Sequence, residues 1–187
     1  MQQKNDRRVR YTKSALKQSL LELMRDKPIE KITVKDICEK ADINRGTFYA
    51  HYSDPYDLLA QIEDELMSEI LKSVETSLQA EDISVLLSDI FESIEKNRDL
   101  CSVLFSEYGD KAFLKRVIFI ARDRSIDEWK RIIPSAKKEQ LAMLYMFYAN
   151  GCIAIIEHWV QNGMQESPME LTTFIEKIST NGLGAFQ

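Results

Sequence analysis

The sequence contains few of the residues that interrupt helices and few of those that bind metals. Its 187 residues include six glycines, four prolines, three cysteines and two histidines. Scarce glycine and proline, with little period-2 alternation of apolar residues, predict an all-helical fold. The cysteines lie far apart in the chain, and no CxxC pair or Cys/His cluster occurs. We therefore expect no disulfide framework, no metal site and no cofactor.

A hydrophobic run long enough to cross a membrane is also missing. The most apolar run, residues 141–156, is 16 residues long, whereas a spanning helix needs about 20. The polar, basic N-terminal residues have no apolar segment behind them, so we expect no secretory signal. The sequence thus predicts a cytoplasmic protein with no membrane partner.

The residues needed for catalysis are not placed together anywhere in the sequence. No nucleophile stands near a base, and adjacent carboxylates such as Glu63, Asp64 and Glu65 fall on a solvated helix face. We predict no catalytic residue and no enzyme.

Charge is divided unevenly along the chain. Residues 1–52 carry 12 lysines and arginines against 7 acidic residues, whereas residues 53–187 carry 13 against 23. Attraction to phosphates acts over about a Debye length, roughly 8–10 Å. A basic N-terminal unit on an acidic body is therefore compatible with DNA binding despite the net charge of −5.

The most informative stretch, residues 29–59, predicts two short helices joined by a tight turn. Thr33 is a good N-cap, and apolar residues at helical spacing follow it as far as Ala41. Asp42 stands where the turn needs a residue that tolerates a left-handed backbone. Asn44 can cap the next helix, predicted at 45–52. This arrangement is a helix-turn-helix.

The second of these helices carries hydrogen-bond donors on one face. Arg45, Thr47, Tyr49 and His51 suit phosphates and base edges, while Phe48 suits the core. Lys35 and Thr33, at the start of the preceding helix, suit phosphate contacts. The alternative is a solvated helix face. The predicted DNA-binding residues are Thr33, Lys35, Asn44, Arg45, Gly46, Thr47, Tyr49, His51 and Tyr52.

The run TVKDICEKADINRGTFYAHYSDPYDLL at 33–59 resembles the DNA-binding domain of the tetracycline-repressor (TetR) family of bacterial regulators. The resemblance extends back through a first helix at about 12–26. It implies a DNA-binding domain of three helices, with the third helix as the reading element. The sequence departs from the family at Pro55, where a phosphate-contacting lysine is common. Asp54 and Pro55 still make a sound helix start.

We predict two domains and about nine helices. Residues 1–53 form an N-terminal arm and the helix-turn-helix domain, and residues 54–187 form a helical ligand-binding and dimerisation domain. The basic residues 1–10 are expected to be disordered without DNA, either as a groove-tracking arm or as a solubilising tail. Helices are expected at about 54–79, 84–96, 98–107, 110–132, 135–163 and from 168 to about 180.

The predicted helix 135–163 carries two apolar stripes, although one suffices for a surface helix. Paired with the last helix, it would form a four-helix bundle across a two-fold axis. The segment from residue 151 to residue 178 also resembles the C-terminal end of a TetR-type subfamily, at least one of whose members acts by contacting a partner protein. The predicted homodimer interface comprises Met146, Ala149, Gly151, Ile153, Phe174 and Ile178.

Aromatic residues spread through the second domain either line an effector cavity or form an ordinary helix-bundle core. The candidate pocket residues are Phe91, Phe105, Tyr108, Phe119, Tyr145, Tyr148 and Trp159, from a set that also includes Phe113 and Trp129. His158 is expected to be a surface or interface residue rather than a ligand.

Together these patterns predict a transcriptional regulator, a repressor released from a palindromic DNA operator by a small-molecule effector of unknown identity. The alternative is a protein-binding adaptor of the same fold that has weak or no operator binding of its own.

Overall fold

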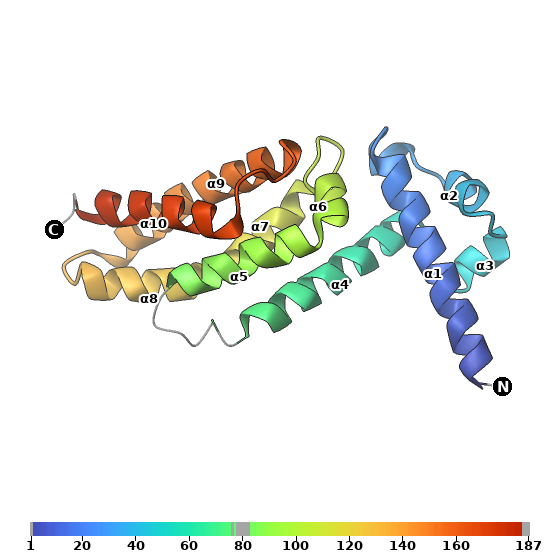
Figure 1. The fold of residues 1–187 in the computed structure, drawn as a ribbon, viewed down its shortest axis with the longest axis horizontal. Helices are drawn as coiled ribbons and strands as arrows, with labels where there is room; N and C mark the ends of the chain where they lie inside the picture. Colours follow the sequence, from blue (N-terminus) through green and yellow to red (C-terminus); the bar gives the residue numbers. More distant parts are fainter. Residues whose placement is uncertain (1, 76, 78–82, 185–187) are drawn as a thin grey trace. The chain divides into compact units, whose positions relative to one another are not determined.

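The computed structural model describes residues 2–75, 77 and 83–184, and its secondary structure within these ranges is entirely helical (Figure 1). The prediction of an all-helical fold is confirmed. The described residues form ten α-helices rather than about nine. The helices are α1 (Gln2–Met24), the 3₁₀ helix η1 (Ile29–Lys31), α2 (Val34–Ala41), α3 (Arg45–Tyr49), α4 (Pro55–Val74), α5 (Ile83–Lys96), α6 (Arg98–Leu104), α7 (Lys111–Phe119), α8 (Arg122–Ile132), α9 (Lys138–Gln161) and α10 (Pro168–Gly184).

The chain divides into two compact units. Unit 1 contains the residues up to Leu66 together with Ser106–Gly109, and unit 2 contains Met67–Phe105 and the residues from Asp110 onward. The division falls inside α4, whereas the boundary predicted from the sequence, between residues 53 and 54, lies just before this helix.

The core of unit 1 is built around α1. Leu16, Leu20 and Met24 follow one another at a spacing of four residues and have no exposed surface. They share the core with Ile37 of α2 and Phe48 of α3, which are also fully buried. At the edge of this core, ion pairs join Lys40 to Glu22 at 2.8 Å and Lys17 to Glu65 at 3.3 Å.

The N-terminal residues differ from the prediction of a disordered arm. α1 begins at Gln2, ten residues before the predicted start at about residue 12. The physical reason is local. Residues 2–10 contain glutamine, lysine and arginine, which favour helices, and no glycine or proline.

Unit 2 is a helical body in which α5 packs on α10, and α9 packs on α6, α7 and α8. By length and composition alone α9 could cross a membrane, a test that core helices of soluble proteins also pass. In the structure, α9 buries one face within unit 2. The buried residues are Leu141, Tyr145, Ala149, Cys152, Ile156, Trp159 and Val160.

The helix predicted at 110–132 is divided into α7 and α8, which accounts for the additional helix. The hydroxyl of Tyr145 donates a hydrogen bond to the carbonyl oxygen of Ile118 at 2.8 Å. The same carbonyl accepts from the amide of Ala121, three residues later, at 3.1 Å. The turn is thereby tightened at Ile120 and Ala121, and a new helix begins at Arg122.

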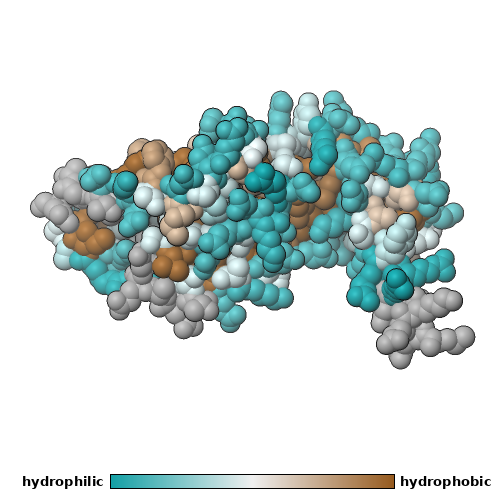
Figure 2. Space-filling model, in the orientation of Figure 1, coloured by the Kyte–Doolittle hydropathy of each residue, from teal (hydrophilic) through white to brown (hydrophobic). Residues whose placement is uncertain are grey.

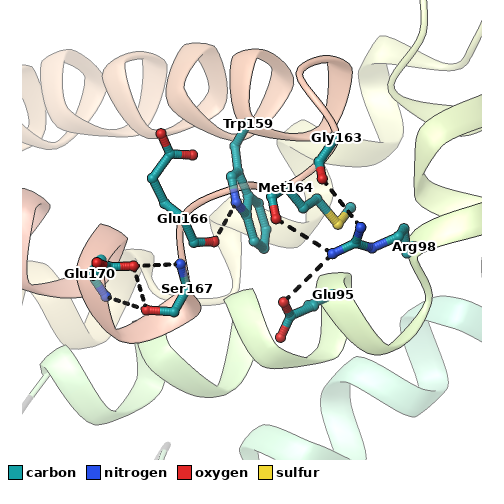
Figure 3. Close-up of polar contacts among 8 residues, drawn as sticks. All are labelled: Glu95, Arg98, Trp159, Gly163, Met164, Glu166, Ser167 and Glu170. Carbon is teal, nitrogen blue, oxygen red and sulfur yellow. Dashed lines mark hydrogen bonds and ion pairs between the residues drawn. The ribbon is translucent and has the colours of Figure 1, made fainter.

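The corner between α9 and α10 is held by side chains from α6 and α9 (Figure 3). Arg98 of α6 donates to the carbonyl oxygens of Gly163 at 3.2 Å and Met164 at 3.4 Å. Gly163 has a φ of 78°, the left-handed conformation common after a helix C-terminus. The indole of Trp159 donates to the carbonyl oxygen of Glu166 at 2.8 Å. These bonds satisfy carbonyl groups of the connection between α9 and α10, and they hold this connection to α6 and α9.

Candidate functional sites

The turn between α2 and α3 is fixed by caps at both helices. Thr33 and Asp36 form a capping box at the start of α2, with Asp36 Oδ2 accepting from the Thr33 amide at 3.0 Å. Asp42 ends α2 in the left-handed conformation, with a φ of 54°. Asn44 Oδ1 then accepts from the amide of Gly46 at 2.7 Å. The predicted caps and turn are confirmed.

The two faces of α3 differ in burial. Phe48 is fully buried, and its ring centroid lies 5.7 Å from those of both Tyr49 and Tyr52. Arg45 and Thr47 are exposed, as is 58% of Tyr49. Phe48 thus anchors α3 and leaves its donors on the surface. α3 ends at Tyr49 rather than at residue 52, because His51 bonds back to Phe48 in a tighter turn.

The remaining predicted DNA-binding residues lie in the same unit but differ in exposure. Thr33, Lys35, Asn44 and Gly46 are exposed, and His51 is half-buried. Tyr52 is only 6% exposed, and Lys13 Nζ lies 5.8 Å from its ring centroid. The helix-turn-helix pattern did not indicate Lys13, because this residue belongs to α1, outside the pattern.

The start of α4 is well capped, with Pro55 as its first residue. Asp54 Oδ1 accepts from the amide of Asp57 at 2.8 Å, and the Asp57 carboxylate accepts from the amide of Ser53 at 2.8 Å. The bond from Ser53 lowers the pKa of Asp57. Pro55 is buried, and its missing N–H falls where a helix needs no donor.

A cavity of about 110 Å³ lies within unit 2. Two of the predicted pocket residues, Tyr145 and Tyr148, line it, together with Trp129 and the carboxylates Glu128 and Glu176. The pocket residues predicted from the sequence were all aromatic and did not include the two glutamates.

The other predicted pocket residues lie elsewhere. Phe91 and Trp159 pack edge to face at a centroid distance of 5.6 Å, and Phe105 stacks on Phe113 at 6.2 Å. Phe119 is 52% exposed, and Tyr108 belongs to the segment assigned to unit 1.

Apolar side chains reach the surface over α9 and α10 (Figure 2). Four residues predicted at the dimer interface are exposed there: Met146, Gly151, Phe174 and Ile178. A Cβ atom on Gly151 would meet nothing within 4 Å, so this helix face is open in the protomer. Ile153 is half-buried. Ala149 is 5% exposed and lines the cavity instead.

Among the described residues, no group of three or more His, Cys, Asp or Glu is arranged to hold a metal ion. The three cysteines are buried and free. His158 is exposed, and its ring nitrogen lies 3.1 Å from the side-chain amide of Asn162.

Two segments of the chain match known protein families. Residues 19–62 match a family described as "Bacterial regulatory proteins, tetR family", and residues 81–181 match one described as "Transcriptional regulator C-terminal region". The uncharacterized HTH-type transcriptional regulator YvdT of Bacillus subtilis (strain 168) is 23% identical over 120 residues, which are 62% of this chain and 56% of YvdT. The chain thus matches little more than half the length of this relative.

Solved structures share the fold at low sequence identity. A TetR transcriptional regulator from Streptococcus agalactiae 2603V has a TM-score of 0.69 and 21% identity, with 96% of this chain and 99% of that chain covered. The dihydroxyacetone kinase operon activator DhaS has a TM-score of 0.62 and 17% identity, with coverages of 94% and 98%.

Proposed function

Because the chain belongs to the TetR family of bacterial transcriptional regulators, we propose that it acts in the cytoplasm as a homodimeric repressor on a palindromic operator. Proteins of this family bind DNA, typically act as dimers and are not enzymes. The proposal divides the chain into a DNA-binding domain, residues 1–53, and a helical ligand-binding and dimerisation domain, residues 54–187.

The observation that carries the DNA-binding proposal is the exposed face of α3. Arg45, Thr47 and Tyr49 stand on a helix whose opposite side is anchored by the buried Phe48 and whose start is capped by Asn44. A rigid helix with donors at its exposed N-terminal end fits the reading role in a major groove. Thr33 and Lys35, at the start of α2, would contact phosphates.

The dimer proposal rests on the open apolar face of α9 and α10. Met146, Phe174 and Ile178 are between 44% and 61% exposed, and soluble monomers rarely leave such clusters uncovered. Pairing this face with its copy would form a four-helix bundle. A two-fold axis then requires an operator with two half-sites about one helical turn apart.

Release by an effector is proposed through α4, the helix in which the two units meet along the chain. A ligand in the unit 2 cavity would shift α4 and change the spacing of the two α3 helices. Coupling energies of about 1–3 kcal/mol would weaken DNA binding roughly 5- to 150-fold.

Two observations favour other roles. Pro55 stands where the resemblance implies a phosphate-contacting lysine, which leaves open an adaptor that binds proteins and has weak or no operator affinity. The description of DhaS as an operon activator favours activation as an alternative to repression.

A gel shift with fragmented genomic DNA separates these roles. The full-length protein at nanomolar concentration should retain a small set of fragments in the presence of excess random DNA. Weak retention of all fragments alike would contradict operator recognition and favour the adaptor. Transcription from a retained promoter with and without the protein then distinguishes a repressor from an activator.

A further inference from the structure

Lysine and arginine are missing from the part of the sequence that follows Arg45. Residues 46–71, which contain the rest of α3 and most of α4, include six acidic residues and neither of these cations. The turn after α3 and the start of α4 therefore supply no lysine or arginine to a DNA phosphate. A phosphate neutralised at this end of α3 needs a cation from another element of unit 1.

Lys13 of α1 places a cation at this end of α3. Its ammonium nitrogen lies 5.8 Å from the ring centroid of Tyr52, which stands between α3 and α4. An aromatic ring attracts an ammonium group at this distance. Tyr52 is 6% exposed, and its ring centroid lies 5.7 Å from that of Phe48. Because Phe48 anchors α3, the ring that holds Lys13 is fixed relative to the proposed reading helix.

The charge of Lys13 differs from that of the next lysine on α1 in having no acidic partner. Lys17, one turn further along the helix, pairs with Glu65 at 3.3 Å. Among the residues whose side chains the structure describes, no carboxylate forms an ion pair with Lys13. Lys13 is half-buried, which suits a lysine that lays its stem on a ring and keeps its ammonium group in water.

Arg10 adds a second cation on the same side of α1. It is exposed and lies three residues before Lys13, so the two side chains are neighbours on the helix surface. Residues 7–13 contain four lysines and arginines and no acidic residue. This part of α1 is therefore a positively charged element beside the end of α3.

We propose that Lys13 binds a backbone phosphate of the operator next to the base pairs read by α3, with Arg10 as a second phosphate contact. Tyr52 acts through Lys13, as the positioning residue that holds the ammonium group. The site rests on the proposed DNA-binding function and adds to it an element outside the helix-turn-helix. Phosphate contacts carry no base information but fix the register of a reading helix in its groove.

The salt dependence of DNA binding by the full-length protein tests the site. Lys13→Gln should weaken binding to a retained genomic fragment and to random DNA alike, with a salt slope shallower by about 0.9. Lys13→Met, which keeps an unbranched stem on the Tyr52 ring, should give the same slope as Lys13→Gln. Lys13→Arg should restore the wild-type slope.

Lys17→Gln is the matched control, because it removes the same charge from a lysine of α1 that is already paired with Glu65. Its salt slope should equal that of the wild type. An unchanged slope in both Lys13→Gln and Lys13→Met, or an equal decrease in Lys17→Gln, would overturn the proposal. Lys13→Met keeps the test valid if Lys13→Gln fails to fold.

A double-mutant cycle tests the role of Tyr52. Tyr52→Leu should weaken DNA binding in the wild-type background and add little in the Lys13→Gln background. Tyr52→Phe, the conservative variant that keeps the ring, should rescue the binding lost in Tyr52→Leu. Additive losses from Tyr52→Leu and Lys13→Gln would overturn the positioning role.

Ethylation interference on a retained fragment locates the contact. Ethylation of a phosphate at the flank of each half-site should hinder the wild-type protein, and Lys13→Gln should no longer be hindered at that phosphate. Identical interference patterns for the two proteins would overturn the placement of Lys13 at the DNA backbone.

Failure of this inference is distinguishable from failure of the proposed function. Selective DNA retention with an unchanged salt slope in the Lys13 variants leaves the operator proposal intact and removes the phosphate site. A shallower slope in these variants without selective retention by the wild type keeps the phosphate site and removes operator reading.

Discussion

The side-chain oxygen of Asn44 accepts the amide hydrogen of Gly46 at 2.7 Å, and a Cβ atom on Gly46 would lie 3.2 Å from that same oxygen. The cap of α3 and the glycine beside it are therefore coupled, because a side chain at residue 46 would press on the capping oxygen. The pair orients a helix of only five residues, too short to be stable by itself.

Removing this cap should weaken unit 1 and its DNA binding together. Asn44→Ala should lose about 1 kcal/mol of unfolding free energy, whereas Asn44→Ser should retain most of it, because serine also caps helices. Denaturant unfolding gives the energies and gel shift gives the affinity. If both variants are stable but neither binds DNA, Asn44 contacts the operator directly instead of acting through the cap.

Acid should destabilise unit 1 through Asp36. The bond from the Thr33 amide, followed by that from Lys27, holds the pKa of Asp36 below its ordinary value of 3.8. The folded protein therefore binds this proton less readily than the unfolded chain. The stabilisation is present above about pH 4 and is lost as pH falls through the depressed pKa. Asp36→Asn should lose less unfolding free energy than the wild type as the pH falls below about 4. An equal loss in the variant and the wild type would contradict this role of Asp36.

The basic N-terminal part of α1 should act through phosphates. Replacing Arg7 and Arg8 by glutamine preserves helix propensity and removes two exposed cations. We expect weaker binding to all DNA sequences, a salt slope shallower by about 0.9 for each phosphate that is no longer neutralised, and unchanged thermal stability. Lys111→Gln with Lys115→Gln, on α7, is the matched control. An unaltered slope would identify residues 2–10 as a solubilising extension.

The dimer should be sensitive to residue 151. Because nothing lies within 4 Å of a Cβ atom there, Gly151→Leu should leave the protomer folded. At a two-fold interface the leucine should overpack the contact and weaken dimerisation by about 1–3 kcal/mol or more. Dissociation of the dimer should then abolish operator binding. Sedimentation measures the assembly, with the exposed Ala112→Leu of α7 as control. A wild-type protein that is monomeric at micromolar concentration would contradict the proposed dimer. A Gly151→Leu protein that stays dimeric would show that the interface lies on another surface.

Local interactions explain why the helix-turn-helix was predictable. Thr33, Asp42 and Asn44 act on backbone groups within a few residues, so their identities in the sequence determine the caps and the turn. The burial of Phe48 follows in the same way from its position opposite the donors on α3.

Long-range contacts explain what the sequence did not predict. At the break between α7 and α8, the carbonyl oxygen of Ile118 accepts a hydrogen bond from Tyr145, which lies 27 residues away in the sequence. The cavity raises the same difficulty, because aromatic residues fit a core and a pocket equally well. Phe91 and Trp159 pack on each other, whereas Trp129 joins Tyr145 and Tyr148 at the cavity.

The central claim, operator reading by α3, is tested most directly by nuclease protection of a retained genomic fragment with wild-type protein and Arg45→Ala. Wild-type protein should protect two inverted half-sites with centres about 10 base pairs apart. Arg45→Ala should bind about 1–3 kcal/mol more weakly and lose base preference at one position in each half-site. Unchanged protection and unchanged base preference in Arg45→Ala would contradict the placement of α3 in the major groove.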